Sequence, residues 1–146
     1  MTYAPPRGAR RHSANAYSSI GLETQVLSAS PERLITLLFE GALSAITKAR
    51  LHLQMGNIAE RGMAISKAID IVDSGLKLSV DTEAGGEVAQ SLVAAYELVL
   101  HNLMLANLNA DETKLSVAET LLKDIGSAWR EACDPATEPT RLQVHS

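Results

Sequence analysis

The sequence predicts an all-α fold, an antiparallel up-down-up-down four-helix bundle. Apolar residues make up 46% of the 146-residue chain and aromatic residues only 3%, and the apolar share is mostly leucine, alanine and isoleucine, which helices accommodate well. A β-sandwich of this size would draw on more aromatic and β-branched residues. Apolar residues also recur at helical spacing in four segments of matched length, roughly 31–38 Å each at 1.5 Å per residue. Short links between such segments favour neighbours that run antiparallel.

The first helix is predicted to begin at Ser30, whose hydroxyl can cap free backbone N–H groups, with Pro31 at the first helical position. Its apolar stripe is wide, and Gly56 fits a left-handed C-terminal cap. The stripe comprises Leu34, Ile35, Leu38, Phe39, Ala42, Leu43, Ala45, Ile46, Ala49 and Leu53.

The second helix follows at once, because Asn57 and Glu60 have the spacing of a capping box. It carries two adjacent apolar rows, which are wider together than one face of a bundle core requires. The rows are Ile58, Ile65, Ile69, Val72 and Leu76, and beside them Ala64, Ala68, Ile71 and Leu78.

A polar link over residues 79–86 ends in the pair Gly85-Gly86, which lets the chain turn tightly into the third helix. That helix runs to about Asn107 and again shows two rows, namely Val88, Leu92, Tyr96, Val99 and Leu103, and beside them Ala89, Val93, Leu100 and Met104. Asp111 is the expected N-cap of the fourth helix, whose stripe is Leu115, Ala118, Leu122, Ile125 and Trp129.

Residues 30–133 thus form the predicted bundle, between two segments of different composition. Residues 1–29 contain three arginines, one glutamate and several prolines, glycines and serines, and predict a loosely ordered N-terminal arm that could include a short extra helix. Residues 134–146 contain two prolines and predict a disordered tail. The arm is slightly basic and the body acidic, so the two should attract weakly at low salt.

Composition and motifs exclude several classes of protein. No uninterrupted apolar run approaches the roughly 20 residues that cross a bilayer, and no apolar region of a signal peptide follows the N-terminal arginines. The single cysteine, Cys133, cannot make an internal disulfide, which fits a reducing cytoplasm. A net charge of -4 argues against nucleic-acid binding. We therefore expect a soluble cytoplasmic protein with no membrane insertion and no nucleic-acid partner.

The residues with chemical potential form no convincing catalytic or metal site. A di-iron bundle needs repeated Glu-x-x-His pairs, and the nearest approach is the single pair Glu97 and His101. No zinc-binding motif and no nucleophile–base set is present. One alternative remains, a histidine phosphotransfer bundle, because His52 is followed by Gly56 four residues later. Met55 stands where a lysine would help to hold the phosphoryl group, which argues against this alternative. We therefore expect neither catalysis nor a bound metal or cofactor.

The doubled apolar rows leave two interpretations open. They are either ordinary core packing in a bundle rich in small residues, or one row forms a groove for another chain. A third possibility is a homodimer through the same rows. Tyr17, Ile20 and Leu22 give the N-terminal arm an apolar side that could cover a groove when no partner is bound.

Several segments together resemble the flagellar secretion chaperones of the FliS type. The opening signature of that family matches Ala16-Tyr17, the run from Ser28 to Leu34, and Leu38-Phe39-Glu40-Gly41-Ala42, with Ser28, Phe39 and Glu40 as mild departures. The resemblance continues to about residue 130, through Lys67-Ala68, Leu78-Ser79-Val80-Asp81, Gly85-Gly86-Glu87-Val88-Ala89, Ala106-Asn107, Leu121-Leu122 and Ala128-Trp129.

The resemblance implies a cytoplasmic export chaperone and not an enzyme. Such proteins bind the disordered C-terminal region of flagellin, prevent its premature polymerisation and deliver it to the flagellar type III export apparatus. Partners would then be flagellin, the export gate and other flagellar proteins. The implied partner-binding residues are Tyr17, Ile20, Ser30, Pro31, Ile65, Ile69, Ile71, Val72, Leu92, Val93 and Tyr96.

Overall fold

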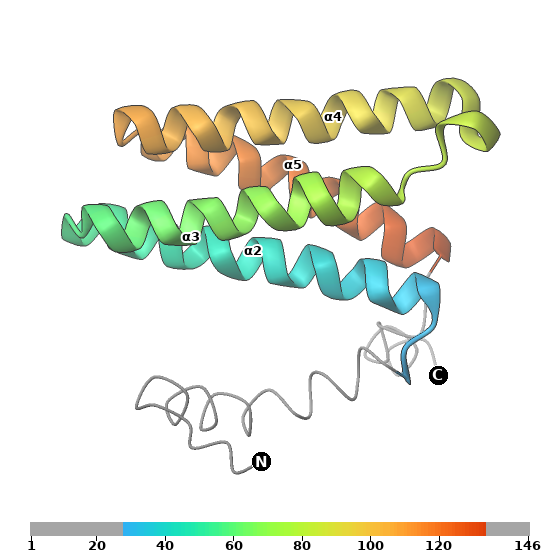
Figure 1. Ribbon diagram of the computed structural model, residues 1–146, viewed down its shortest axis with the longest axis horizontal. Coiled ribbons are helices and arrows are strands. Elements are labelled where there is room, and N and C mark those ends of the chain that lie inside the picture. The colour runs from blue at the N-terminus through green and yellow to red at the C-terminus, as the bar shows by residue number, and fades with distance from the viewer. Residues whose placement is uncertain (1–27, 134–146) are drawn as a thin grey trace, which may run out of the picture.

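The computed structural model describes residues 28–133, and this part of the chain forms four antiparallel helices without a β-strand (Figure 1). The predicted all-α bundle is confirmed. Most of the predicted arm and all of the predicted tail lie outside the described residues. The elements are α2 (Pro31–Met55), α3 (Ile58–Asp70), η1 (Ile71–Leu76), η2 (Lys77–Ser79), α4 (Thr82–Asn109) and α5 (Glu112–Cys133).

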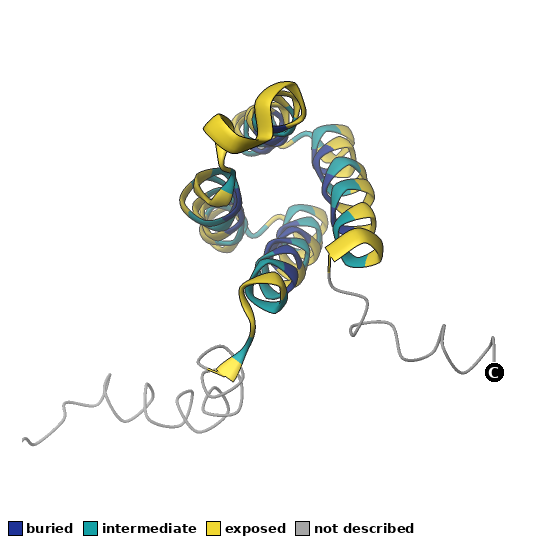
Figure 2. Cartoon of the chain, turned by 90° about the vertical axis from the view of Figure 1, so that its right-hand side faces the viewer, coloured by how far each residue is buried: buried dark blue, intermediate teal, exposed yellow. Residues whose placement is uncertain are grey.

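The four helices stand at the corners of a square when the bundle is viewed from its end (Figure 2). Each helix contacts the next one along the chain, and α5 returns to contact α2. The buried faces of all four helices point to the centre of the square. This order of neighbours is the up-down-up-down topology that short links favour.

Both predicted ends of the first helix are confirmed. The backbone N–H of Arg33 donates to Ser30 Oγ at 3.1 Å, and Pro31 occupies the first turn. Gly56 ends α2 with φ 76°, a left-handed conformation that glycine adopts without steric cost. Asp111 is also confirmed as a cap, because its Oδ1 accepts from the backbone N–H groups of Thr113 and Lys114.

The predicted capping box at the start of the second helix is wrong. Asn57 makes no side-chain cap hydrogen bond. Its Nδ2 lies 3.2 Å from Nδ1 of His52 instead, so the side chain is engaged with the end of α2 and is not available to α3. The turn at Gly56 is only two residues long, which brings the two helix ends within reach of each other.

The predicted second helix is not α-helical to its end. After Asp70 the chain continues as the π-helical turn η1 and the short 3-10 turn η2. The buried residues Ala68, Val72 and Leu76 follow one another at intervals of four, which exceeds the 3.6 residues of an α-turn. The wider π-turn keeps all three in the core, where a strict α-helix would rotate them progressively outward.

The predicted link over residues 79–86 is too long, because α4 begins at Thr82 and contains the glycine pair. Asp81 caps the helix by accepting from the backbone N–H groups of Glu83 and Ala84 at 3.1 and 3.0 Å. One turn later Gly86 interrupts the helix with φ 58° and ψ -133°. Only glycine reaches this backbone conformation easily, and the chain then enters the long straight part of α4.

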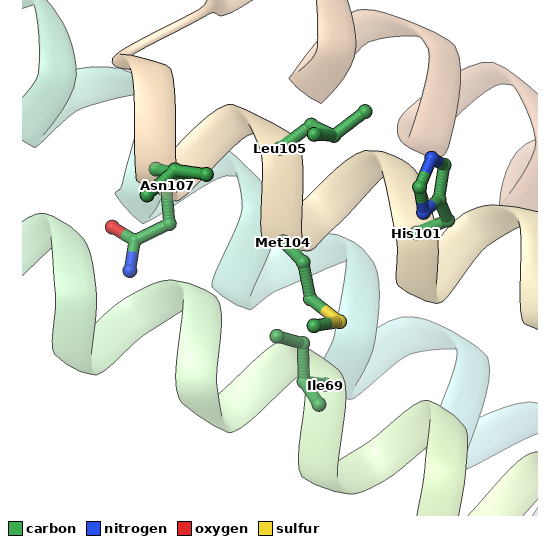
Figure 3. A pocket seen from close by; sticks show the side chains of 6 residues that line it. Ile69, His101, Met104, Leu105 and Asn107 are labelled. Atoms are coloured by element: carbon green, nitrogen blue, oxygen red, sulfur yellow. The ribbon is translucent and has the colours of Figure 1, made fainter.

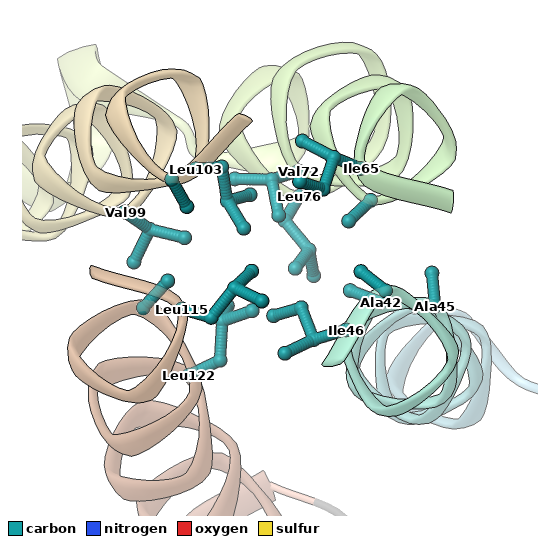
Figure 4. Close-up of a cluster of buried hydrophobic side chains, with 14 of the residues drawn as sticks. Ala42, Ala45, Ile46, Ile65, Val72, Leu76, Val99, Leu103, Leu115 and Leu122 are labelled. Carbon is teal, nitrogen blue, oxygen red and sulfur yellow. The ribbon is translucent and has the colours of Figure 1, made fainter. Parts of the chain in front are cut away.

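The core is aliphatic and is filled from all four helices (Figure 4). Among the described residues, Phe39 on α2 and Tyr96 on α4 are its fully buried aromatic members, with ring centroids 6.3 Å apart. The largest side chains with less than 2% exposure, apart from Thr36, are Ile46, Ile65, Val72, Leu76, Val99, Leu103, Leu115 and Leu122. Alanines fill the remaining core positions, which lets the helices approach closely.

Polar contacts join α2 to α5 along much of their length. Arg50 donates to both carboxylate oxygens of Glu119, at 3.2 and 3.0 Å, and to Ser116 Oγ at 3.4 Å. Gln54 donates to Glu112 at 2.7 Å near one end of the pair. At the other end Trp129 Nε1 donates to the carbonyl oxygen of Glu32 at 3.2 Å. The first and last described helices are therefore held together by directed bonds as well as by packing.

Candidate partner-binding surface

Helix α4 exposes several large apolar side chains on its outer face in addition to those that it buries on its inner face. Leu98, Met104 and Leu108 are 49%, 60% and 78% exposed, whereas the core residues Val99 and Leu103 are fully buried. A helix that is apolar all round is normally buried on all sides. In the described part of the chain nothing covers the outer face of α4, so this face is the strongest candidate for a partner-binding surface.

By length and composition alone, α4 could also cross a membrane, and 28% of its most apolar stretch is buried in the bundle. This is weak evidence for a membrane span, because core helices of soluble proteins pass the same test. The fully buried Val99, Leu103 and Ala106 lie on the inner face of this helix. A membrane-spanning α4 would have to withdraw these residues from the core.

A hollow of about 390 Å³ lies between α3 and α4 (Figure 3). In Figure 3 Met104 points from α4 toward Ile69 on α3. Arg61 bridges the same pair of helices by donating to Asn107 Oδ1 at 3.3 Å and to its carbonyl oxygen at 3.1 Å. The lining is largely apolar and consists of Ile69, His101, Met104, Leu105, Asn107 and Leu108.

A second hollow, of about 270 Å³, lies where the start of α2, the start of α4 and the end of α5 meet. Trp129 forms part of its wall and is held in place by its bond to Glu32. The polar rim consists of Ser79 and Asp81, which precede α4, and of Gly85 in its first turn. The apolar residues that line it are Ile35, Val80, Val88, Ala89, Leu92, Tyr96 and Trp129.

The structure distributes the expected partner-binding residues among several environments. Ile69 and Leu92 are half-buried and line the first and second hollow respectively. Ile71 and Val93 are half-buried and line neither of them. These four residues can still reach a partner at the surface. Tyr17 and Ile20 lie outside the described residues.

Three expected residues lie in the core. Ile65 and Val72 are fully buried, and Tyr96 is 3% exposed. Burial raises the pKa of the Tyr96 hydroxyl to about 12, since a phenolate would lose its hydration there. The periodicity of the sequence predicts their apolar rows correctly, but it does not tell a row that faces the core from the row beside it.

Ser30 and Pro31 are both exposed at the start of α2. The contacts described for Ser30 are those of a helix cap, because its Oγ accepts from Arg33 and its carbonyl oxygen from Leu34. Their match to the family signature is therefore accounted for by helix initiation, and a contact with a partner stays a prediction.

Sequence reasoning left several lining residues out of the expected site. Leu105 and Leu108 line the first hollow, and Ile35, Val80 and Trp129 line the second. A signal was available for the first hollow, because α4 has no lysine or arginine from Thr82 to Asn109. The second hollow depends on three distant parts of the chain and leaves no local pattern.

The structure places the residues of the two chemical alternatives, a phosphotransfer histidine and a metal site. His52 is half-buried in the last turn of α2, where its ring lies against Asn57. Within residues 28–133 no group of three or more histidine, cysteine, aspartate or glutamate side chains could hold a metal ion. Glu97 and His101 are both exposed on α4, and only His101 lines the α3–α4 hollow.

The family model described as flagellar protein FliS matches residues 13–136 of this chain. The chain belongs to the FliS family. The flagellar secretion chaperone FliS of Salmonella typhimurium is 43% identical over 122 residues, which cover 84% of this chain and 90% of that protein. The FliS of Escherichia coli is 41% identical over 117 residues, covering 80% and 86%. FliSB of Pseudomonas aeruginosa is 38% identical over 113 residues, covering 77% and 89%.

The FliS match confirms the resemblance found in the sequence motifs, which already covered most of the bundle. The matched residues include α2 to α5 and therefore both hollows and the outer face of α4. The FliS relatives named above are described as chaperones.

Proposed function

We propose that this chain is a cytoplasmic chaperone that binds the disordered C-terminal region of flagellin, prevents its premature polymerisation and delivers it to the flagellar type III export apparatus. Family membership supports the proposal, because the relatives are named flagellar secretion chaperones. The export gate and other flagellar proteins are further proposed partners.

The observation that carries the proposal is the exposed apolar outer side of α4 with the hollow beside it. Ordering a disordered segment costs about 1–2 kcal/mol of backbone entropy per residue. Burying apolar surface returns roughly 25 cal/mol per Å², so only a long apolar contact can offset that cost. The exposed methionines Met63 and Met104 would adapt such a surface to an irregular client.

Within this proposal the two hollows are entry points for apolar side chains of flagellin. Ile69 would meet the client between α3 and α4, and Leu92 would meet it at the opposite end of the bundle. The N-terminal segment around Tyr17 would be rearranged when flagellin binds, as the resemblance implies.

Isothermal titration of the full chain with a peptide of the flagellin C-terminal region tests the proposal. We expect saturable one-to-one binding and a gain of helical circular dichroism beyond the sum of the separate components. A peptide of the same composition in scrambled order is the control. If the native peptide binds no better than the scrambled one, or if the chain fails to delay flagellin polymerisation, the proposal is wrong.

A further inference from the structure

The polar side chains between α2 and α5 are matched in one half of this helix pair and unmatched in the other. Near the C-terminal end of α2, Arg50 donates to Glu119 on α5. Gln54 donates to Glu112 one turn further along α2. In the other half Arg130 of α5 has a buried Nε atom, and this atom has no hydrogen-bond partner among the described residues. One guanidinium group is therefore left without an acceptor.

Arg130 lines a hollow of about 20 Å³ between α2 and α5. We call it the α2–α5 hollow, and it is also lined by Thr36 and Glu40 of α2 and by Lys123 and Gly126 of α5. A buried water molecule needs about 10–15 Å³. The hollow therefore admits one small polar group, such as the head of a carboxylate, but neither a phosphate group nor an aromatic ring. A carboxylate is also the acceptor that a guanidinium group bonds most strongly.

The other side chains around Arg130 do not supply this carboxylate. The ion pairs among the described residues do not include Arg130. Glu40 lines the hollow but is paired with Arg33 at 3.9 Å. Lys123 adds a second positive charge and lies 3.9 Å from Glu119. Burying a guanidinium nitrogen without a partner is unfavourable, so the α2–α5 hollow favours one additional anion.

The segment that follows α5 contains a carboxylate within reach. Helix α5 ends at Cys133, and Glu138 comes five residues later. The distance from Cys133 back to Gly126 is about 11 Å along the helix, and five extended residues span up to about 17 Å. Pro135 disfavours a helical conformation of Asp134, so α5 does not carry Glu138 away from the bundle.

A carboxylate of the same chain is a better occupant than one from another molecule. One charge-assisted hydrogen bond is too weak to hold a free molecule at micromolar concentration. A short tether gives Glu138 an effective concentration in the millimolar range, which a single bond can use. One anchored side chain also needs no helix or strand in residues 134–146, whose two prolines argue against both.

We propose that the α2–α5 hollow binds the side-chain carboxylate of Glu138 of this chain. Arg130 is its main ligand, and Lys123 contributes the second positive charge. The bond attaches the segment after α5 to the α2–α5 side of the bundle, which is opposite the α3–α4 side in the square of helices (Figure 2). The segment is thereby kept away from the α3–α4 hollow. The inference goes beyond the proposed function, because it requires no client.

Nuclear magnetic resonance of the full chain tests the proposal at Arg130 itself. The Nε–Hε signal of this residue is identified by its loss in Arg130→Lys. We expect its proton to resonate downfield of those of exposed arginines and to exchange slowly with water, because a carboxylate accepts from it. Glu138→Gln should move the signal upfield and speed up the exchange several-fold. Asp134→Asn removes the other acid of residues 134–146 and is the matched control, which should leave the signal unchanged.

A double-mutant cycle tests whether the two side chains act on each other. We expect Glu138→Gln to lower the melting temperature by about 4 °C. In the Arg130→Met background the same replacement should have no effect, because its partner is absent. Circular dichroism shows whether Arg130→Met is folded, and Arg130→Lys takes its place if it is not.

Three outcomes would overturn the proposal. An Arg130 signal that is the same in Glu138→Gln as in the unaltered chain would exclude Glu138 as the occupant. A change of this signal in Asp134→Asn and not in Glu138→Gln would assign the hollow to Asp134. Equal effects of Glu138→Gln on the melting temperature with and without Arg130 would show that Glu138 acts elsewhere. No flagellin peptide is used, so these results are independent of the test of the proposed function.

Discussion

Arg50 on α2 donates hydrogen bonds to both carboxylate oxygens of Glu119 on α5, with N–O distances of 3.2 and 3.0 Å. The two residues are 69 positions apart in the sequence, and their side chains are 23% and 18% exposed. The forked geometry matches the guanidinium group to the carboxylate, which makes this bond stronger than an ordinary surface ion pair. This pair of residues joins the first and last described helices by two hydrogen bonds.

Replacing Arg50 should weaken the bundle in a pH-dependent way. We expect Arg50→Met to lower the free energy of unfolding by about 1–2 kcal/mol at pH 7. The hydrogen bond from Arg50 lowers the pKa of Glu119, so this stability is present above the ordinary value of 4.5 and is lost as the pH falls through the lowered pKa. Urea denaturation at pH 7 and near pH 3 should show the difference shrinking in acid. Lys48→Met, an exposed change on the same helix, is the control and should have little effect at either pH.

Two helical glycines should respond in opposite directions to alanine. A Cβ atom at Gly126 would lie 3.2 Å from the ring carbons Cδ1 and Cγ of Phe39, so Gly126→Ala overpacks the α2–α5 contact. At Gly62 the nearest atom is 3.9 Å away, and there alanine only improves helix propensity. We expect Gly126→Ala to destabilise by about 1–2 kcal/mol and Gly62→Ala to stabilise by up to about 1 kcal/mol. Thermal unfolding of both variants measures this, and changes of the same sign would contradict it.

The buried phenol of Tyr96 should resist ionisation. The chain has three tyrosines, so the variant Tyr3→Phe, Tyr17→Phe leaves Tyr96 as the only reporter. Absorbance at the phenolate band should rise near the raised pKa of about 12 and not near 10. Because the unfolded chain ionises first, stability should fall as the pH rises above 10. A midpoint near 10 in the folded chain would show that the hydroxyl is hydrated.

Ile65 and Ile69 are one helical turn apart and should separate stability from binding. Ile65 is fully buried, and Ile65→Ala should cost about 2–5 kcal/mol of stability. Ile69 lines the α3–α4 hollow, and Ile69→Ser should weaken flagellin-peptide binding several-fold with a smaller loss of stability. Unfolding and titration of both variants decide this. If Ile69→Ser leaves binding unchanged, flagellin does not use this hollow.

Tyr17 is a proposed binding residue that lies outside the described residues. We expect Tyr17→Ala to reduce affinity for the flagellin peptide while changing the melting temperature little. Tyr17→Phe keeps the ring and separates the role of the hydroxyl. If Tyr17→Ala lowers stability as much as affinity, Tyr17 acts by stabilising the folded chain and not by contacting flagellin.

The helices and most of their ends were predictable because local signals determine them. Ser30, Gly56 and Asp111 act through hydrogen bonds and backbone angles within a few residues, so the sequence near each one is sufficient. The capping box predicted at Asn57 is wrong because the tight turn at Gly56 brings the Asn57 side chain to His52. The capping pattern does not include this interaction. The π-helical turn after Asp70 was not predicted for a similar reason. It keeps Val72 and Leu76 in the core, and the position of the core depends on the other helices.

The candidate surface was predictable in kind but not in detail. The doubled rows on the second and third helices indicated more apolar surface than one face of a core needs, and Val88 and Met104 of these rows are exposed on α4. The exposed Leu98 and Leu108 lie outside the predicted rows. Which row points inward depends on where neighbouring helices lie, so Ile65 and Val72 could not be told from Ile69 by phase. Residues such as Trp129 and Ile35 meet only in the folded chain, and no local pattern pairs them.

The seam between α2 and α5 has a consequence for synthesis on the ribosome. Glu119 and Trp129 are translated 69 and 97 residues after their partners Arg50 and Glu32. A nascent chain that ends before α5 can pair α2 with α3 but leaves one side of the square open, with Phe39 and Ile46 lacking their last neighbours. Cooperative folding must therefore wait until α5 has left the exit tunnel, and until then the nascent chain exposes its future core to the cytosol.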